Sequence, residues 1–225
     1  MMGRSGFRAH FFKEKWNPWA PVLILVATFV VFSPALRNDF VNWEDDVNVT
    51  ENPFVKQLNG ENIKGLFKQT ITGGYRPLAT LTFALEHHFF GLNPLVYHLN
   101  NILLHLLCTL LFYIFLRKMG AGLIIAFVAA MLFGIHPMRV ESVAWITERK
   151  DVLYSLFFLT SMILYLKWYR DRRLLFYFLA LVAFILALLS KIQAVALPIV
   201  LLLMDFYHER TFRLKHLTDK IPFLL

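Results

Sequence analysis

Asn38–Pro53 reads NDFVNWEDDVNVTENP and carries three consecutive acids, Glu44, Asp45 and Asp46. It follows Trp19–Leu36, an apolar run long enough to cross a lipid bilayer as a helix. Three like charges at a membrane surface repel one another, so either water solvates them or they act on a cation, a metal or a proton. The first alternative predicts an ordinary solvated loop. The second predicts a site at the mouth of a membrane-embedded cavity.

The composition indicates an integral membrane protein. Hydrophobic residues make up 58% of the 225 residues and charged residues 17%, whereas soluble domains are about half apolar and about a quarter charged. The apolar runs lack the two-residue alternation of barrel strands, so their backbone groups must be satisfied within helices. The predicted fold class is therefore all-α integral membrane. Cys108 is the single cysteine and has no disulfide partner within the chain.

A polytopic helical bundle with six complete spans and the start of a seventh is predicted. The apolar runs, separated by turn residues, charges and prolines, are Trp19–Leu36, Leu95–Leu116, Gly122–Ile135, Val152–Tyr169, Leu174–Ser190 and Ala194–Tyr207. Ile221–Leu225 begins the seventh, so we expect the protein to continue and this domain to be incomplete. The first run is too long for a cleaved signal peptide and further spans follow it, so we expect it to be retained.

The distribution of charge predicts the orientation of the spans. One side, which includes the basic N-terminus (residues 1–15), holds 14 of the 23 Lys and Arg residues, and the other side holds 10 of the 15 acids. Because Lys and Arg concentrate in cytoplasmic loops, the N-terminus is predicted to be cytoplasmic. Residues 16–225 then form one transmembrane domain whose long loop, residues 38–90, lies outside. The net charge of +8 reflects this topology, and no continuous basic face for nucleic acid is expected.

The long outer loop is predicted to be ordered against the membrane surface. Asn-Pro, Asn-Gly and Gly-Gly pairs mark its turns, and two segments between them carry helical amphipathic spacing. We expect these segments, Glu61–Gln69 and Pro77–Phe90, to form short interfacial helices. Met138–Asp151, on the same side, is expected to be a polar connection between spans.

Polar residues on the predicted outer side favour a cavity that opens outward. An ionisable group at a span end can snorkel to the interface, which accounts for Arg149 or Lys191 alone. It accounts less well for His136 and Glu141, which flank a helix break. The polar groups on this side are the three acids, Tyr75-Arg76, His136, Glu141, Arg149-Lys150-Asp151 and Lys191-Gln193.

Four stretches resemble the transmembrane half of the transmembrane-and-tetratricopeptide-repeat proteins. They are the acidic stretch above, YRPLATLTFALEHHFFGLNPLVYHLNNILLH from Tyr75, LFGIHPMRVESVAWITERKDVLYSLFFL from Leu132 and LLSKIQAVALPIVLLLMDFY from Leu188. The resemblance covers about Asp39 to Tyr207, and HPMRVESVAWITERKD is most similar to the bacterial branch. These proteins resemble the GT-C superfamily of membrane glycosyltransferases, which includes protein O-mannosyltransferases. No tetratricopeptide repeat lies within these 225 residues.

The resemblance implies transfer of a sugar from a polyprenyl-phosphate donor to a hydroxyl acceptor, a protein hydroxyl in eukaryotic relatives. Asp45 and Asp46 match an acidic pair of the first outer loop, where an acid acts as catalytic base or binds a metal. A divalent metal at these two residues therefore stays open. Ile192 stands where eukaryotic relatives tend to carry an acid, so the sugar and acceptor stay open too. The expected location is the inner (cytoplasmic) membrane, with the active face periplasmic or extracellular.

The residue types suit this chemistry. A carboxylate beside a like-charged neighbour is suited to accept the hydroxyl proton. The lipid phosphate is an anion, which Arg or Lys near the membrane boundary can hold. The residues assigned to the donor phosphate are Arg76, Arg149, Lys150 and Lys191, and Tyr75, His136 and Glu141 are counted among the substrate contacts. His136 precedes a proline at a helix end, so a helix cap is its alternative role.

Two polar groups have simpler explanations. His98, Asn101 and His105 share one helix face, and hydrogen bonds between spans account for them. His87 and His88 lie beside Glu86 as if to bind a metal, but adjacent residues of a helix point to different faces. The sequence carries no P-loop, Rossmann glycine pattern, HExxH or nucleophile elbow.

Two other classes of function stay open. A transporter or channel would carry charges or broken helices at mid-span, whereas the charges of this chain lie mainly at span ends. A non-catalytic membrane anchor for a tetratricopeptide-repeat scaffold would have the same sequence features if the outer acids had lost their function.

Overall fold

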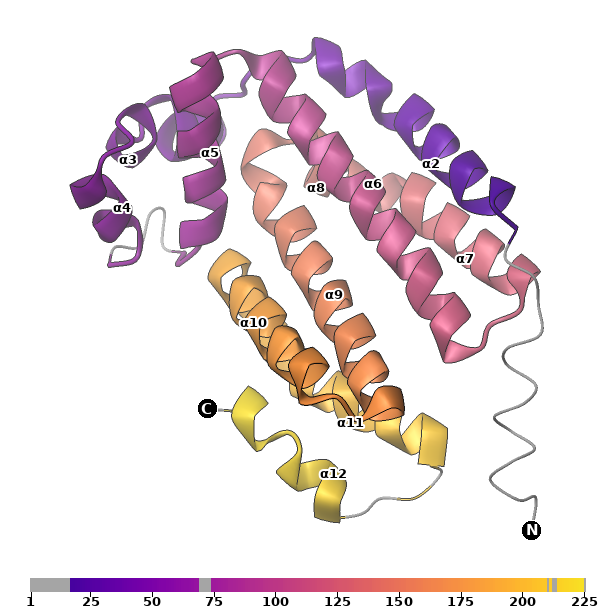
Figure 1. Ribbon diagram of the computed structural model, residues 1–225. Helices are drawn as coiled ribbons and strands as arrows, with labels where there is room; N and C mark the ends of the chain where they lie inside the picture. The colour runs from indigo at the N-terminus through magenta and orange to yellow at the C-terminus, as the bar shows by residue number, and fades with distance from the viewer. Residues whose placement is uncertain (1–16, 69–73, 210, 212–213, 225) are drawn as a thin grey trace.

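The computed structural model describes residues 17–68, 74–209, 211 and 214–224, and the fold is all-helical (Figure 1). The predicted cytoplasmic segment, residues 1–15, lies outside the described residues. The α-helices are α2 (Trp19–Phe32), α3 (Pro53–Lys56), α4 (Gly60–Leu66), α5 (Pro77–Phe90), α6 (Pro94–Met119), α7 (Leu123–Ile135), α8 (Val140–Ala144), α9 (Arg149–Asp171), α10 (Leu174–Ser190), α11 (Leu197–Glu209) and α12 (Leu214–Thr218). Short 3₁₀ turns are η1 (Ser33–Arg37), η3 (Pro137–Arg139), η4 (Ile146–Glu148), η5 (Ile192–Ala196) and η6 (Ile221–Phe223), and η2 (Asp46–Thr50) is a π-helix.

Four described helices are long and apolar enough to cross a membrane. They are Trp19–Arg37, Pro94–Met119, Ile146–Asp171 and Ile192–Glu209. Helix α7 joins them as a fifth only together with η3 and α8, which continue from it across a bend of 51°. Each of the six predicted apolar runs is helical, but α10 has 17 residues and falls short of these four. The structure therefore supports a multi-pass bundle of four or five spans, and the count of six stays a prediction.

Local sequence explains where the longest helix begins and ends. Pro94 occupies the first turn of α6, where its missing N–H costs no helical hydrogen bond. The side chain of Asn93 caps the same end by accepting from the N–H of Leu95. Gly120 closes the other end with φ of 97°, a left-handed conformation that a glycine adopts without strain.

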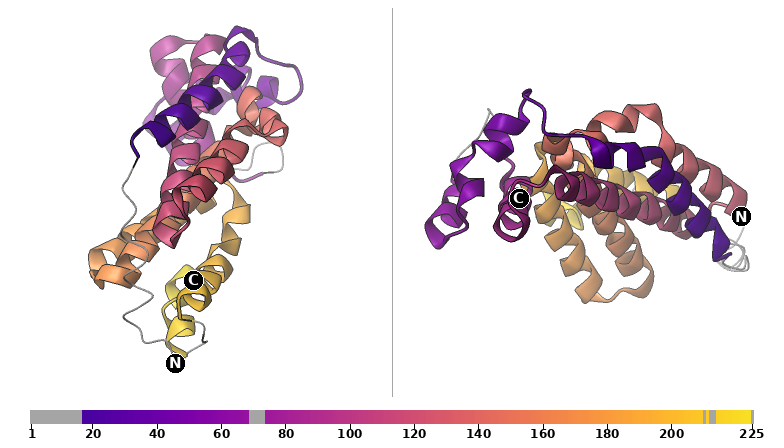
Figure 2. Two further views of the ribbon diagram at one scale, coloured as in Figure 1. Left: turned by 90° about the vertical axis from the view of Figure 1, so that its right-hand side faces the viewer. Right: turned by 90° about the horizontal axis from the view of Figure 1, so that it is seen from above.

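The bundle is arranged around α9 and α6. Helix α9 packs against α10 on one side and α6 on the other, and α6 packs in turn against α7 and α2 (Figures 1 and 2). Helices α2, α6 and α7 approach closely at Gly134, where a Cβ would overlap Thr28 Oγ1 and press on Thr109. Small residues allow such close approach of membrane helices, so Gly134 fixes the packing of α7.

The predicted outer loop forms helices at one end of the bundle, where α5 packs against α10, α9 and α6 (Figure 1). Helix α5, Pro77–Phe90, has the predicted bounds. Helix α4 runs from Gly60 to Leu66, one residue before the predicted start of Glu61–Gln69, and the last residue of that prediction lies outside the described residues. Helices α3 and α4 project sideways from the bundle in the view from above (Figure 2).

The predicted polar connection Met138–Asp151 consists largely of short helical turns. It consists of η3, α8 and η4, and its last three residues, Arg149–Asp151, form the first turn of α9. The segment connects α7 to α9 as predicted, and two of its charged residues, Arg149 and Asp151, form ion pairs with Glu86 and Lys191.

A buried ion pair lies at the opposite end of the bundle, beside α12. The Lys220 ammonium, 1% exposed as a residue, contacts a carboxylate oxygen of Asp205 and the hydroxyl of Tyr165. The Tyr165 hydroxyl also lies 2.9 Å from each Asp205 oxygen. Burial lowers the pKa of Lys220 and the Asp205 carboxylate partly offsets this effect. These contacts fix the C-terminal segment against α9 and α11.

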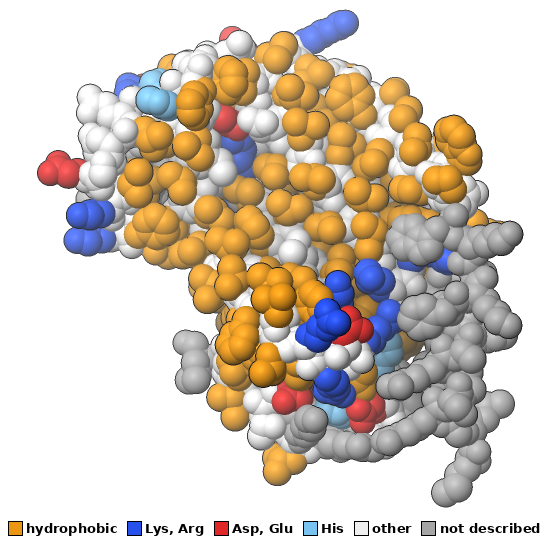
Figure 3. Space-filling model, in the orientation of Figure 1, with side chains coloured by type: hydrophobic (Ala, Val, Ile, Leu, Met, Phe, Trp, Pro, Cys, Tyr) orange, Lys and Arg blue, Asp and Glu red, His pale blue; other side chains and the backbone are white. Residues whose placement is uncertain are grey.

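The surface agrees with a membrane environment. Large apolar side chains are exposed along α2, α6, α7, α10 and α11. Figure 3 shows hydrophobic side chains over most of one face, with the densest group of charged side chains in its lower part. An apolar surface of this extent is unsuited to water and suits a lipid-facing bundle.

Candidate functional site

The three consecutive acids have different surroundings. Glu44 lies 3.8 Å from Nη2 of Arg76, which also donates to Asn48 Oδ1 at 3.1 Å. Asn48 in turn donates to the backbone carbonyl of Glu44 at 2.9 Å. This arrangement joins the N-terminus of α5, where Arg76 lies, to the acidic stretch. The mutual repulsion of the acids is thus relieved by turning their carboxylates toward different groups.

Asp45 is buried and fully engaged. The residue is 1% exposed, and its Oδ1 accepts hydrogen bonds from the backbone N–H of Thr147 at 3.0 Å and from Thr147 Oγ1 at 2.6 Å. Its Oδ2 accepts from the N–H of Val41 at 3.0 Å. Hydrogen bonds of this kind satisfy a buried carboxylate. Asp45 therefore ties the outer loop to the η4 turn, which lies 102 residues later.

Asp46 is the partly exposed member of the pair. It begins the π-helix η2. This conformation is rare in proteins, and where it occurs it is often at a functional site. Its Oδ1 accepts only the N–H of Val47, at 2.8 Å, and its Oδ2 accepts no hydrogen bond from a described residue. The Asp46 carboxylate is therefore the one of the pair that a substrate can reach.

Arg149 lies at the centre of a buried polar network. It is 0% exposed, with Nε donating to Asn101 Oδ1 at 2.7 Å and Nη2 to the carbonyl of Tyr97 at 2.9 Å. Nη1 forms an ion pair with Glu86 and also donates to Thr82 Oγ1. The guanidinium therefore links α5, α6 and α9. To contact a donor phosphate, as the sequence predicts, it would have to leave these partners.

Glu86 is the acidic member of this network. Burial raises the pKa of its carboxyl, and the nearby Arg149 guanidinium partly opposes that rise. Glu86 Oε1 also accepts a hydrogen bond from Asn100, whereas Oε2 has no partner among the described residues. His87, the next residue, is partly exposed, and His88 is exposed. In the described part of the chain no group of three or more His, Cys, Asp and Glu residues is placed to hold a metal ion.

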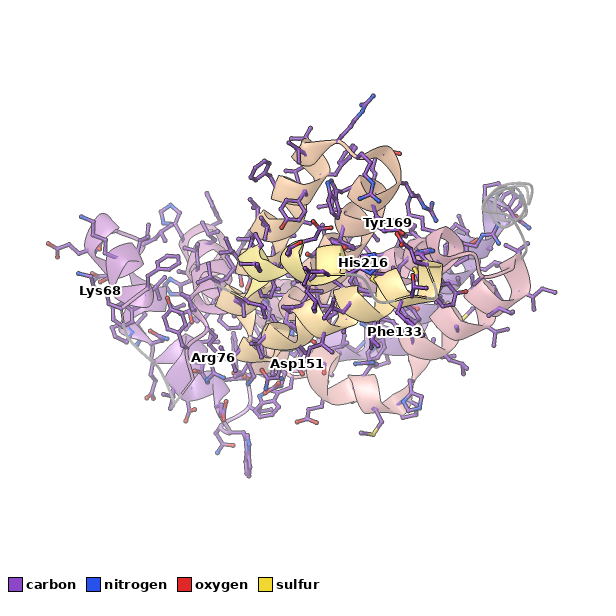
Figure 4. The ribbon with its side chains drawn as sticks, turned by 90° about the horizontal axis from the view of Figure 1, so that it is seen from below. Lys68, Arg76, Phe133, Asp151, Tyr169 and His216 are labelled. Carbon is purple, nitrogen blue, oxygen red and sulfur yellow. The ribbon has the colours of Figure 1, made fainter. Side chains whose placement is uncertain are left out.

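A cavity of about 200 Å³ lies between α6, α7, α8, α9 and the start of η5. Lys191 and Asp151 line it and form an ion pair, and Ser142 Oγ donates to Asp151 Oδ2 at 3.2 Å. Arg139 also lines it, with its guanidinium 4.6 Å from the centre of the Phe133 ring. In Figure 4, Asp151 lies between Phe133 and Arg76. With two cations and one carboxylate, the lining carries a net positive charge.

The remaining predicted site residues do not join one site. His136 is exposed and its Nδ1 accepts from the N–H of Met138 at 3.2 Å, which is the helix-cap role given as its alternative. Glu141 is exposed, Lys150 pairs with Glu148, and the Tyr75 hydroxyl donates to the Phe67 carbonyl at 3.2 Å.

The polar face of α6 makes the predicted contacts between helices. Asn101 Nδ2 donates to the carbonyl of Trp145 at 3.2 Å, and His105 Nε2 lies 2.9 Å from the carbonyl of Gly134. This prediction is confirmed for these two residues. His98 is buried as well, with its ring close to the backbone of Asp39 and Ala144.

Two kinds of site residue were missed from the sequence. Thr147 holds Asp45, but a single threonine in a connection carries no motif. Arg139 and Ser142 line the cavity together with the predicted Lys191, and they precede α9 by several residues. The signal in the sequence is the number of polar residues between two apolar runs, but this number does not single out Arg139 or Ser142.

These features define a multi-pass helical membrane protein with a carboxylate pair and a basic cavity. A family model described as dolichyl-phosphate-mannose-protein mannosyltransferase matches residues 37–218. The chain belongs to this family. The match contains both the acidic pair and all the residues of the cavity.

Individual relatives agree with this family. The chain is 33% identical over 211 residues to protein O-mannosyl-transferase F38B6.6 of Caenorhabditis elegans, covering 85% of the chain and 29% of the relative. It is 36% identical over 157 residues to protein O-mannosyl-transferase TMTC1 of Homo sapiens, covering 65% of the chain and 18% of the relative. It is 47% identical over 93 residues to protein O-mannosyl-transferase TMTC2 of Mus musculus, covering 41% and 11%. The chain thus spans less than a third of each. No solved structure matches it.

Proposed function

We propose that the protein transfers a sugar, mannose by its family, from a polyprenyl-phosphate donor to a protein hydroxyl on the non-cytoplasmic face. Membership of the mannosyltransferase family supports this reaction. The single observation that carries the site is the contrast between two neighbours. Asp45 is buried and hydrogen-bonded through both oxygens, whereas Asp46 is partly exposed and its Oδ2 accepts no hydrogen bond from the described part of the chain.

In this proposal Asp46 is the general base. The acceptor hydroxyl oxygen attacks the anomeric carbon, the bond from that carbon to the phosphate oxygen breaks, and the hydroxyl proton passes to Asp46. A base must lie within hydrogen-bond reach of that proton, which requires exposure. Asp45, with three hydrogen bonds to its carboxylate, holds the loop in place instead.

The basic cavity supports a place for the donor phosphate. Lys191 and Arg139 bring two cations to it, and an arriving phosphate would compete with the Asp151 carboxylate for Lys191. A lipid phosphate leaving after sugar transfer gains negative charge, which nearby cations stabilise. Arg76, beside the acidic stretch, is the second candidate contact. Arg149 contributes by holding the helices together.

Replacing Asp46 with Asn tests the proposed base. The complete protein is reconstituted in liposomes with polyprenyl-phosphate mannose and an acceptor peptide, and we expect a rate about 10²–10⁴-fold lower with donor affinity unchanged. Asp39→Asn is the matched control, because Asp39 is exposed in the same loop and accepts the N–H of the residue after it. If Asp46→Asn keeps full activity, Asp46 is not the base, and if Asp45→Asn keeps it too, neither carboxylate is. If the complete wild-type protein transfers no sugar in this assay, a non-catalytic membrane anchor becomes the better explanation.

We further propose the bacterial branch of the family and a location in the inner membrane. The run from His136 to Asp151 and the distribution of Lys and Arg support these points. The proposed topology has six spans, a cytoplasmic N-terminus and the acidic pair outside. Reporter fusions at Lys56 and Lys118 test it, since periplasmic activity of the reporter at Lys118 would reject this orientation.

A further inference from the structure

Thr147 makes the long-range contact of the acidic pair. Both of its donors, the backbone N–H and Oγ1, point to the same oxygen of Asp45, at 3.0 and 2.6 Å. Thr147 is 2% exposed and Asp45 is 1% exposed, so water does not compete for these bonds. The remaining hydrogen bond of the Asp45 carboxylate comes from Val41, in the same loop. Thr147 is thus the group through which the bundle holds Asp45.

The turn that carries Thr147 is fixed on both sides. Asn101 Nδ2 donates to the carbonyls of Trp145 and Ile146 at 3.2 and 3.4 Å, just before Thr147. Asn101 Oδ1 accepts a hydrogen bond from Nε of Arg149, which lies two residues after Thr147. The amide of Asn101 on α6 therefore holds the turn both before and after Thr147. These bonds restrain the turn on both sides of Thr147, and Thr147 in turn restrains the outer loop through Asp45.

The same segment also lines the cavity. Ser142 lies five residues before Thr147 and Asp151 lies four residues after it, and the two side chains are hydrogen-bonded to each other. Asp151 in turn pairs with Lys191. A single short stretch of chain, residues 142–151, therefore contacts the acidic pair through Thr147 and the cavity through Ser142 and Asp151.

We propose that Thr147 is a positioning residue that fixes where the acidic pair lies relative to the cavity. The proposal rests on the proposed function, since it concerns the same transfer reaction. Thr147 holds Asp45, and the backbone from Asp45 to Asp46 presents the second carboxylate outward. Loss of the Thr147 hydroxyl leaves the cavity intact but lets the base move away from the donor. Turnover then falls while the donor still binds.

Thr147→Val tests this proposal because it keeps the side-chain shape and removes the hydroxyl donor. In the complete protein in liposomes we expect kcat to fall about 10- to 100-fold, the range for a hydrogen bond to a charged group, with donor affinity unchanged. Thr147→Ser restores the hydroxyl and should recover most of the rate. Thr160→Val is the matched control, because Thr160 lies on α9 and its hydroxyl donates only within that helix, to Leu156.

Hydrogen exchange gives a readout independent of turnover. We expect faster exchange in residues 38–50 of Thr147→Val and unchanged exchange in Thr147→Ser and Thr160→Val. If Thr147→Val does not fold, which lost donor binding would reveal, Thr147→Cys replaces it, because a thiol is a weak donor of similar size. It should show a reduced kcat.

The outcomes separate the two proposals. Wild-type kcat in Thr147→Val together with slow turnover in Asp46→Asn overturns the positioning role and leaves the proposed function standing. Full activity in Asp46→Asn rejects Asp46 as the base, and the positioning role is rejected with it, whereas loss of transfer in the wild-type protein would overturn the proposed function itself. A fall in kcat that Thr147→Ser does not rescue also rejects the positioning role, because the hydroxyl is then not the group that matters.

Discussion

Replacing Arg149 with Met is expected to destabilise the protein by about 3–5 kcal/mol, the cost of breaking a buried ion pair by removing one partner. Methionine retains an unbranched, flexible side chain but removes the charge and every donor. Glu86 would lose its cation, and its Oε2 already lacks a partner in the described residues. Asn101 Oδ1 and the Tyr97 carbonyl would each lose the hydrogen bond they accept from Arg149. Each buried group left without a hydrogen bond costs a further 1–3 kcal/mol or so. The lower end of the first range, about 3 kcal/mol, is therefore a minimum for the expected loss of stability.

The assay is unfolding in detergent micelles by heat or by added denaturing detergent, followed by circular dichroism. Lys150→Met is the matched control, because Lys150 is the next residue and its ion pair with Glu148 is partly exposed, at 13% for the lysine side chain. Partly exposed pairs contribute on the order of 1 kcal/mol or less. We therefore expect a large loss of stability in one variant and a small loss in its neighbour.

The double variant of Arg149 and Glu86 sharpens the test. If the two groups stabilise each other, Glu86→Gln and Arg149→Met together should cost less than the sum of the single changes. The reasoning is refuted if Arg149→Met unfolds within about 1 kcal/mol of the wild type and loses donor binding instead. Arg149 would then be a phosphate contact, as the sequence predicts.

The remaining predictions concern packing, a second ion pair and pH. Lys220→Met should cost about 3–5 kcal/mol, and combining it with Asp205→Asn should cost less than the sum, as measured by the same unfolding assay. Gly134→Ala should cost about 1–3 kcal/mol by overpacking against α2, whereas Gly60→Ala, with no atom near the added Cβ, should cost less. Burial raises the pKa of Glu86, so its favourable contribution to stability is complete below the unfolded pKa and falls as pH rises through the folded pKa. We expect the melting temperature of the wild type to fall as the pH rises from the unfolded pKa to the folded pKa of Glu86. An equal fall in the melting temperature of Glu86→Gln over the same pH range would contradict this.

Helix positions followed closely from the sequence because apolar periodicity and helix-ending residues are local. The runs around Pro94 and Gly120 predicted α6 to within a few residues, and α5 has its predicted bounds. The span count was less secure, because α10 is short and α7 passes the length test only with the bent segment that follows it. A helix must exceed a minimum length to cross the membrane, so a difference of one or two residues decides whether it counts as a span.

The acidic pair was found from its charge and its place after the first span, but the roles of its members were not. Asp45 and Asp46 are adjacent and chemically identical, and one is buried while the other is partly exposed. The position of Arg149 near a span end predicts a phosphate contact, whereas the residue is 0% exposed in the structure. Sequence position reports the depth of a residue in the membrane but not the direction of its side chain.

The amino-acid sequence accounts for the fold class, the helices and the presence of acids and bases at one end, since each depends on composition or on spacing within about twenty residues. Tertiary contacts assign the partners: Asp45 to Thr147 across 102 residues, Arg149 to Glu86 across 63 and Lys191 to Asp151 across 40. Hydrogen bonds between residues so far apart follow no spacing rule. They form only where packed helices bring the groups within about 3 Å and exclude the water that would otherwise compete.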